Sequence, residues 1–301
     1  MRKDIEFNAD GVTLRGWHYT PDKGPKTGKG PFPTIIMAHG FSGVKEMDLD
    51  KYAEVFAAGG LGALVYDNRC LGSSDGEPRS DIDPVWQRRD YRSAITFAET
   101  LPEVDSDRIG VWGTSYTGGT VCAVTALDRR VKCVVSQVPY MVGHKNVQQF
   151  LPITGVKAFH DMLDADRARR VNGEPSEYMK MCSLDPNEPH LFPGEETYNY
   201  IHNFVDNDPN CTWENRVTLR SLDYMLEYDV SGYMEMISPT PLLMIISDCD
   251  TTTPSDIALE CFHKVPGPKE LMVVNSNHYA AYTDKFDETS AAARDWFNKH
   301  L

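Results

Sequence analysis

The sequence predicts an α/β fold, a mostly parallel, doubly wound sheet with helices on both faces. Short and nearly continuous apolar runs recur along the chain, which is typical of strands buried on both faces. Helical patterns separate these runs, so successive strands are expected to join through right-handed crossovers. One interval, residues 140–238, has no strong strand signal and is too long for a loop. We therefore expect a helical lid inserted between two strands of the sheet.

The elements follow in order along the chain. Alternating apolar residues around Asp10-Gly11 predict an N-terminal hairpin, and the Gly/Pro/Lys-rich stretch from Pro21 to Pro33 predicts an exposed loop. The buried strands are predicted at residues 34–38, 63–66, 109–112, 131–135, 242–246 and 271–274. Helices are predicted at residues 51–58, 86–101, 156–170, 214–228 and 289–301. Residues 1–139 and 239–301 then form the core, and residues 140–238 form the lid.

Composition narrows the class of protein. The 301 residues carry a net charge of −14, which disfavours nucleic acid and anionic membrane surfaces as partners. The seven cysteines are scattered with no C-x-x-C pair, so neither a disulfide framework nor a zinc site is expected. No apolar run reaches 18 residues and the N-terminus has no signal-like segment. We expect a soluble cytoplasmic protein that uses no metal and no cofactor, since nucleotide-binding and metal-binding motifs are absent from the sequence.

A candidate nucleophile lies in the segment from Ile109 to Gly119. An apolar run leads into Gly113-Thr114-Ser115 and then into a small-residue helix start. A serine on a sharp strand-to-helix turn exposes its hydroxyl above the sheet, as a nucleophile elbow requires. Thr117 departs from the usual motif, because glycine is common two residues after the serine. The alternative is that Gly113 and Ser115 form only a turn and a helix cap.

A second loop supplies candidate oxyanion donors. Residues 39–41, His-Gly-Phe, directly follow the predicted strand 34–38. Backbone N–H groups of Phe41 and Tyr116 would then point at a developing oxyanion. We expect His39 to brace this loop rather than to act as a base or ligand.

The general base and its carboxylate are expected late in the chain. His278 follows the predicted strand 271–274 and precedes the last helix, which is the place of the histidine in the order Ser, Asp, His. Asp250 follows the strand 242–246 at the usual spacing before Pro254, and Asp248 is the alternative. The carboxylate would hold the imidazole tautomer and stabilise the imidazolium.

Residues 67–76 resemble the D-x-R-x-x-G-x-S-x-G loop of α/β hydrolases, with Cys70 where glycine is common. Together with residues 113–119 and 213–218 (Trp-Glu-Asn-Arg-Val-Thr), this loop is similar to the fungal polyketide transferase family, which is dienelactone-hydrolase-like. The resemblance covers nearly the whole chain. It implies an α/β-hydrolase fold and acyl transfer or thioester cleavage on a polyketide. It also implies a small-molecule acyl substrate that a carrier protein of a polyketide synthase can deliver.

The sequence therefore predicts a serine acyl hydrolase or acyltransferase that forms an acyl-enzyme on Ser115. The lid is rich in aromatic and Met residues, and we expect Tyr140 and Met141 to contact the substrate. Hydrolysis and transfer both stay open, because they differ in how well the lid excludes water. The alternatives are a general carboxylesterase and a non-hydrolytic binding protein or cyclase of the same fold. A homodimer is left open as the assembly.

Overall fold

The computed structural model describes residues 1–21, 30–192 and 194–301. Its centre is an eight-stranded sheet in the order β1-β2-β4-β3-β5-β6-β9-β10. The strands are β1 (Arg2–Ala9), β2 (Val12–Tyr19), β3 (Phe32–Ala38), β4 (Gly62–Tyr66), β5 (Val104–Thr114), β6 (Val131–Gln137), β9 (Leu242–Ser247) and β10 (Lys269–Val274). The hairpin β1–β2 pairs antiparallel to β4, and the strands from β4 to β10 are parallel.

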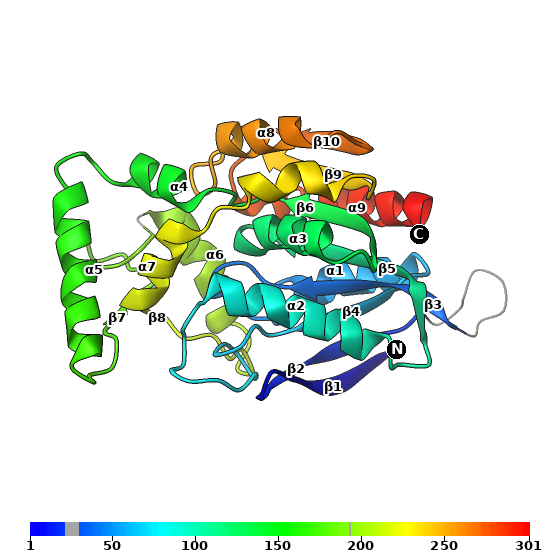
Figure 1. Cartoon of the computed structure of the whole chain (residues 1–301), viewed down its shortest axis with the longest axis horizontal. Helices are drawn as coiled ribbons and strands as arrows, with labels where there is room; N and C mark the ends of the chain where they lie inside the picture. The colour runs from blue at the N-terminus through cyan, green and yellow to red at the C-terminus, as the bar shows by residue number, and fades with distance from the viewer. Residues whose placement is uncertain (22–29, 193) are drawn as a thin grey trace.

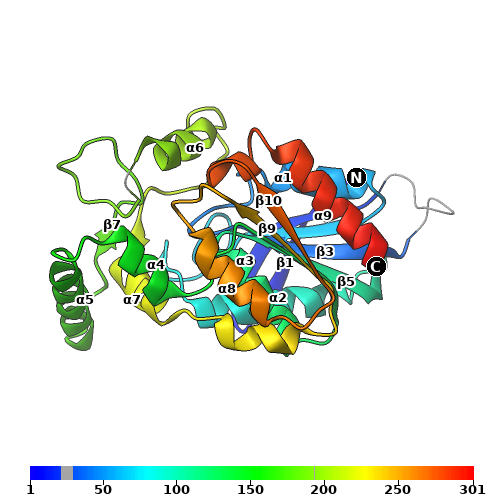
Figure 2. The same ribbon diagram turned by 90° about the horizontal axis from the view of Figure 1, so that it is seen from above.

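Helices cover both faces of this sheet, as expected (Figures 1 and 2). On one face α1 (Leu49–Ala58) packs against α9 (Phe286–His300). On the other face lie α2 (Pro84–Ala98), α3 (Tyr116–Leu127) and α8 (Ser255–Lys264), with the short 3₁₀ helix η1 (Ser231–Ile237) against α3 and α8. The α/β-hydrolase fold is thereby confirmed in its layers and strand order.

The segment between β6 and β9 holds more structure than its sequence indicated. It contains α4 (Gly143–Phe150), α5 (Val156–Val171), β7 (Tyr178–Met179), α6 (Glu195–Val205), β8 (Val217–Thr218) and α7 (Leu219–Glu227). Helices α4, α5 and α7 stand together at one end of the sheet, with α5 farthest out (Figures 1 and 2). The helix predicted at residues 214–228 starts at Leu219, because the chain first pairs with β7 through β8. Helices α4 and α6 were not predicted.

The other predicted elements differ from the structure only in detail. The N-terminal hairpin and the helices around residues 51–58, 86–101, 156–170 and 289–301 are present with slightly shifted ends. Strand β10 is an edge strand, so it is partly exposed rather than buried on both faces. Most of the predicted loop from Pro21 to Pro33 lies outside the described residues. No helix in the described ranges combines the length and apolar character that a bilayer crossing requires.

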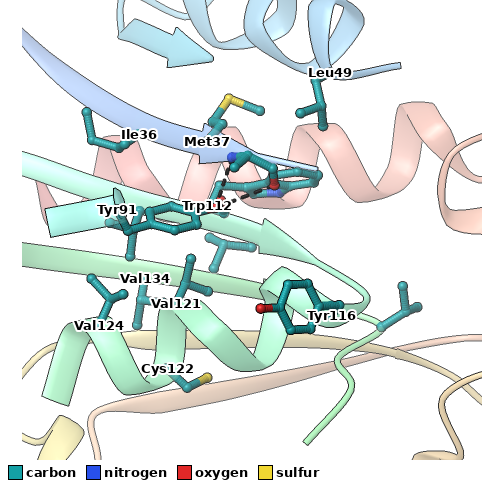
Figure 3. Packing of buried hydrophobic residues seen from close by; sticks show 14 of the residues in the cluster. Ile36, Met37, Leu49, Tyr91, Trp112, Tyr116, Val121, Cys122, Val124 and Val134 are labelled. Carbon is teal, nitrogen blue, oxygen red and sulfur yellow. Dashed lines mark hydrogen bonds between the residues drawn. The ribbon is translucent and has the colours of Figure 1, made fainter. Parts of the chain in front are cut away.

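The core holds the ends of β3 and β5 together just below the candidate site. The Tyr91 hydroxyl, from α2, accepts the Ala38 N–H at 2.9 Å and donates to the Trp112 carbonyl at 3.1 Å. Tyr91 and Trp112 lie close together in this completely buried region (Figure 3). A buried hydroxyl that pairs with both strands fixes their relative position, since breaking either bond would leave a buried polar group without a partner.

Helix α6 is attached to the core through a buried carboxylate. The Tyr200 hydroxyl donates to Asp48 Oδ2 at 3.3 Å, and Lys51 Nζ lies 2.6 Å from Asp48 Oδ1. Burial raises the pKa of Asp48, although Lys51 and Tyr200 oppose this effect. The backbone of Asp48 is also left-handed, with φ of 65°, where Asn is better tolerated than most residues.

We predict that Asp48→Asn stabilises the protein at neutral pH. A carboxyl group whose pKa is raised by folding favours the native state at low pH and opposes it once the pH rises above the native pKa. Removing that charge should therefore raise the free energy of unfolding at pH 7 by about 0.5–1 kcal/mol. The gain should shrink towards zero below about pH 4, where the carboxyl group is protonated in both states.

Urea unfolding at pH 7 and at pH 3.5 measures this difference, and Glu54→Gln on the exposed face of α1 is the control. A loss of stability at pH 7 in Asp48→Asn would contradict the prediction.

Candidate active site

Ser115 occupies a sharp turn between β5 and α3. Its φ of 54° and ψ of −123° lie outside the regions that L residues usually adopt, which costs about 1–3 kcal/mol. Neighbouring backbone holds this conformation, because the Ser115 N–H donates to the Gln137 carbonyl and the Tyr140 N–H donates to the Ser115 carbonyl, each at 2.9 Å. The turn has the form of a nucleophile elbow, in which the hydroxyl stands clear of the sheet edge.

Two glycines allow the chain to pass close to this turn. A Cβ atom on Gly113 would lie 2.2 Å from the Thr117 carbonyl oxygen, so no larger residue fits there. A Cβ atom on Gly40 would lie 2.9 Å from Ser115 Cβ. The loop after β3 therefore lies directly against Ser115, as the position of Phe41 in the sequence indicated.

Thr117 stabilises the elbow where a glycine would contribute no side chain. Its buried hydroxyl donates to the Ala38 carbonyl at 2.8 Å and accepts the Thr114 N–H at 3.0 Å. The departure from the usual motif is thus accommodated by hydrogen bonds that join β3 to the elbow. The Thr117 side chain therefore joins the elbow to β3, whereas a glycine at this position would give only a more flexible backbone.

His278 and Asp250 form a buried pair. His278 Nδ1 lies 2.7 Å from Asp250 Oδ2, and their side chains are 4% and 1% exposed. The Asp250 Oδ1 atom accepts the N–H groups of Thr252 and Thr253 at 2.8 and 2.7 Å, so the carboxylate is held in one orientation. Asp248, the alternative, is exposed and accepts the Ser276 N–H at 3.0 Å.

Thr253 belongs to the same group and was missed in the sequence. Its Oγ1 atom lies 3.0 Å from Asp250 Oδ2 and 3.2 Å from His278 Nδ1, and it donates to the Val138 carbonyl at 2.9 Å. The sequence did contain a signal for this arrangement. An aspartate shortly before a helix commonly accepts, through a side-chain oxygen, the N–H groups of the residues two and three positions later. Helix α8 begins at Ser255, two residues beyond Thr253.

The candidate oxyanion donors lie on either side of Ser115. Tyr116 is the first residue of α3, so its N–H has no acceptor within the helix. The rings of Phe41 and Tyr116 meet edge to face with centroids 6.1 Å apart. Because Gly40 touches Ser115, the Phe41 backbone is also close to the serine.

His39 lies beneath this loop and is not paired with a carboxylate. Its ring stacks on Tyr282 at 6.3 Å and lies against the backbone of Gly43. Burial, with a smaller contribution from the nearby His278, lowers the pKa of His39 to about 4. The imidazole is therefore neutral at pH 7, which fits the expected bracing role.

Two cavities meet at Ser115. The first, which we call the apolar cavity, has about 110 Å³ of space and runs towards α4, α5 and α7. Its walls are mostly aliphatic and aromatic side chains: Phe41, Ser115, Tyr116, Tyr140, Val147, Leu151, Phe159, Leu191, Phe192, Leu222, Met225, Thr252 and Thr253. Tyr140, which the sequence predicts as a substrate contact, lines this cavity. Met141 lines neither cavity and is completely buried.

The second cavity, which we call the histidine cavity, is smaller, with about 50 Å³ of space. It contains His278 and lies between the β3 loop and α6, and its walls are His39, Gly40, Phe41, Ser42, Gly43, Met47, Ser115, Met181, Phe192, Thr197, Tyr200, Ile201, Trp213, Thr252, His278, Tyr279 and Tyr282. Among the described residues, no Asp, Glu, Lys or Arg lines either cavity. Ser115 and His278 therefore share an uncharged space.

The residues of the loop at 67–76 lie outside both cavities. Asp67 accepts the Lys45 N–H at 2.8 Å and pairs with Lys45 Nζ at 2.7 Å, and Arg69 forms a two-pronged ion pair with Asp90. Cys70 is buried with φ of 67°, a left-handed conformation that explains why glycine is common there. Within residues 1–21, 30–192 and 194–301, no three His, Cys, Asp or Glu side chains group as metal ligands.

The fold and this arrangement of residues define an α/β hydrolase. The family model described as X-Pro dipeptidyl-peptidase (S15 family) matches residues 10–170. A thiohydrolase of Eupenicillium brefeldianum is 35% identical over 89% of this chain and 84% of its own length. The polyketide transferase grgF of a Penicillium species is 32% identical over 91% and 87%.

Solved structures give the same result. The α/β hydrolase GrgF from Penicillium sp. sh18 has a TM-score of 0.84 at 27% identity and covers 100% of this chain and 99% of its own. The chain thus belongs to the family of the fungal polyketide transferases and thiohydrolases, within the α/β-hydrolase superfamily. The resemblance on residues 67–76, 113–119 and 213–218 is confirmed at the level of the family.

We predict that Thr117→Val destabilises the protein by about 1–3 kcal/mol. The change keeps the shape of the side chain but removes the buried hydroxyl that accepts the Thr114 N–H and donates to the Ala38 carbonyl. Thr125→Val is the matched control, because the hydroxyl of Thr125, on the same buried face of α3, donates only to the Val121 carbonyl one turn earlier. Urea unfolding of both variants measures the difference, and equal stabilities would contradict a tethering role.

We also predict that Asp250→Asn lowers kcat on a p-nitrophenyl ester by about 10³–10⁴-fold. An amide nitrogen facing His278 Nδ1 would favour the tautomer that has its proton on Nε2, which cannot accept a proton from the serine. Asp248→Asn is the control and should stay within about twofold of the wild type. A similar loss of kcat in both variants would contradict the role of Asp250 as the carboxylate that orients His278.

Proposed function

We propose that this protein is a serine acyl hydrolase or acyltransferase that cleaves an ester or thioester through an acyl-enzyme on Ser115. One observation carries the proposal: the buried His278–Asp250 pair opens into the same uncharged cavity as a serine on a left-handed strand-to-helix turn. The names of the relatives, thiohydrolase and polyketide transferase, support a polyketide acyl chain as the substrate class.

The reaction takes place in two steps. His278 Nε2 accepts the proton of Ser115 Oγ as the oxygen attacks the acyl carbonyl carbon, and the oxyanion is stabilised by the Phe41 and Tyr116 N–H groups. The bond from the carbonyl carbon to the leaving sulfur or oxygen then breaks, and the leaving atom takes the proton from His278. Water or an alcohol gives its proton to His278 and attacks the acyl-enzyme, and Ser115 recovers its proton as the product leaves.

The apolar cavity would hold the acyl chain. Its walls are hydrocarbon and aromatic surface, broken only by a few hydroxyl groups near the serine. Each buried CH₂ group of a chain placed there contributes about 0.8 kcal/mol to binding. We propose residues 140–238 as the lid, because α4, α5 and α7 supply Val147, Phe159 and Met225 to these walls.

We predict that Ser115→Ala abolishes the covalent acyl adduct while the fold is retained. Intact mass spectrometry after brief incubation with an acyl thioester should show the added acyl mass in the wild type and in the control Ser106→Ala, a change at an exposed serine in the long strand β5. The Ser115→Ala protein should show none and should turn over at least 10³-fold more slowly. An adduct that persists in Ser115→Ala would refute the nucleophile assignment.

A general carboxylesterase would give the same adduct from short simple esters. The mass of the adducts across a series of acyl chain lengths separates the two proposals, because a polyketide-type substrate predicts an increase in acylation rate with chain length. A non-hydrolytic binding protein or cyclase would give no adduct with any member of the series.

A further inference from the structure

The two cavities at Ser115 are not equivalent in the reaction, because only one of them contains His278. In acyl transfer the base protonates the leaving atom and later removes the proton of the acceptor. Both groups must therefore pass within hydrogen-bond reach of His278. If the proposed function holds, the leaving group and the acceptor bind in the histidine cavity, and the acyl chain occupies the apolar cavity.

The histidine cavity holds two buried hydroxyl groups with hydrogen atoms to spare. Ser42 Oγ accepts the indole N–H of Trp213 at 3.2 Å, and Thr197 Oγ1 accepts the Tyr279 hydroxyl at 2.7 Å. Ser42 and Thr197 are 4% and 5% exposed. Across the described part of the chain, neither hydroxyl has a protein acceptor for its own hydrogen. A buried donor without an acceptor is costly, so these groups favour a ligand that brings an acceptor oxygen.

The surroundings restrict the chemistry of that ligand. Among the described residues no Asp, Glu, Lys or Arg side chain lines this cavity, and His39 is neutral at pH 7. A charged ligand group would lose its hydration without a counter-charge. The space of about 50 Å³ admits only the few atoms next to the scissile bond. These limits fit an uncharged amide or similar oxygen within a short distance of the leaving atom.

We propose that Ser42 and Thr197 form a specificity site for the leaving group or acceptor, which recognises an uncharged amide a few atoms from the reacting sulfur or oxygen. An amide-bearing thiol of the pantetheine type has this chemistry, and so does an amide-bearing alcohol. This proposal rests on the proposed acyl chemistry, but it concerns which group leaves rather than how the bond breaks.

The test compares two thioesters of one acyl chain. The N-acetylcysteamine thioester carries an amide, and the S-pentyl thioester has a leaving group of similar length without one. We expect the wild type to have a kcat/KM about tenfold higher on the amide thioester. Ser42→Ala and Thr197→Val should each remove about fivefold of this preference, with the loss mainly in KM. Thr197→Ser should restore it, and Thr100→Val, at an exposed hydroxyl, should leave it as in the wild type.

The acceptor step is measured in parallel by offering N-(2-hydroxyethyl)acetamide and butan-1-ol to the acyl-enzyme. A preference in the first step alone assigns the site to a leaving thiol, and a preference in the second step alone assigns it to an acceptor alcohol. Either result supports amide recognition. No amide preference in the wild type, or an equal loss on both thioesters in the variants, would overturn it.

A binding measurement separates this proposal from the acyl chemistry. Calorimetric titration of Ser115→Ala with the N-acetylcysteamine thioester reports affinity without turnover. Adding Thr197→Val should weaken that affinity about fivefold. The result stands even if Ser115 proves not to form an acyl-enzyme, whereas an unchanged affinity would refute the amide site while leaving the nucleophile assignment intact.

Discussion

The backbone conformation at Ser115 is the constraint on which the site depends. A positive φ at a residue with a Cβ atom persists only where the surroundings determine it. Here β5 lies between β3 and β6 in the middle of the sheet, so the turn rises from a strand that is paired on both sides. The Gln137 carbonyl, the Tyr140 N–H and the Thr117 hydroxyl then act on the turn from three directions. These contacts and the paired strand offset the conformational strain at Ser115.

Parallel strands bring the other groups to the same place. Phe41 follows β3, Asp250 follows β9 and His278 follows β10, and the carboxyl ends of all these strands meet at one edge of the sheet. The side chains of Asp250 and His278 meet because β9 and β10 are adjacent and in parallel register. The strand order of the sheet thus brings together residues that are far apart in the chain, and no long-range contact outside the sheet is needed to explain their proximity.

The same reasoning shows what the sequence was able to predict. Strands buried on both faces leave apolar runs that are visible in a single sequence, and a loop position at the end of such a run follows directly. Asp250 was preferred to Asp248 on spacing alone, and it is the residue that contacts His278. The tether formed by Thr117 was not predictable, because its acceptor, the Ala38 carbonyl, belongs to a strand 79 residues away.

The segment inserted between β6 and β9 was harder to predict from the sequence, for a physical reason. Helix α4 begins with Gly143 and polar residues, so its start has no apolar periodicity or capping residue to mark it. Helix α6 is tied to the core by Tyr200 and Thr197, whose partners Asp48 and Tyr279 lie far away in the sequence. The division of the space at Ser115 into two cavities depends on such contacts. Sequence patterns report local preference, and this division is set by tertiary packing alone.

The absence of charge around the reacting groups connects the fold to the proposed chemistry. The chain carries a net charge of −14, yet among the described residues no Asp, Glu, Lys or Arg lines either cavity, and the carboxylate of Asp250 reaches the site only through its pairing with His278. The side chains of His278 and Asp250 are buried, and between buried groups the attraction of a carboxylate for an imidazolium is stronger than in water. His39, held neutral by burial and by its neighbour, adds no competing positive charge. In the proposed reaction the proton moves between Ser115, His278 and the leaving or attacking group, and Asp250 stabilises the imidazolium without taking the proton.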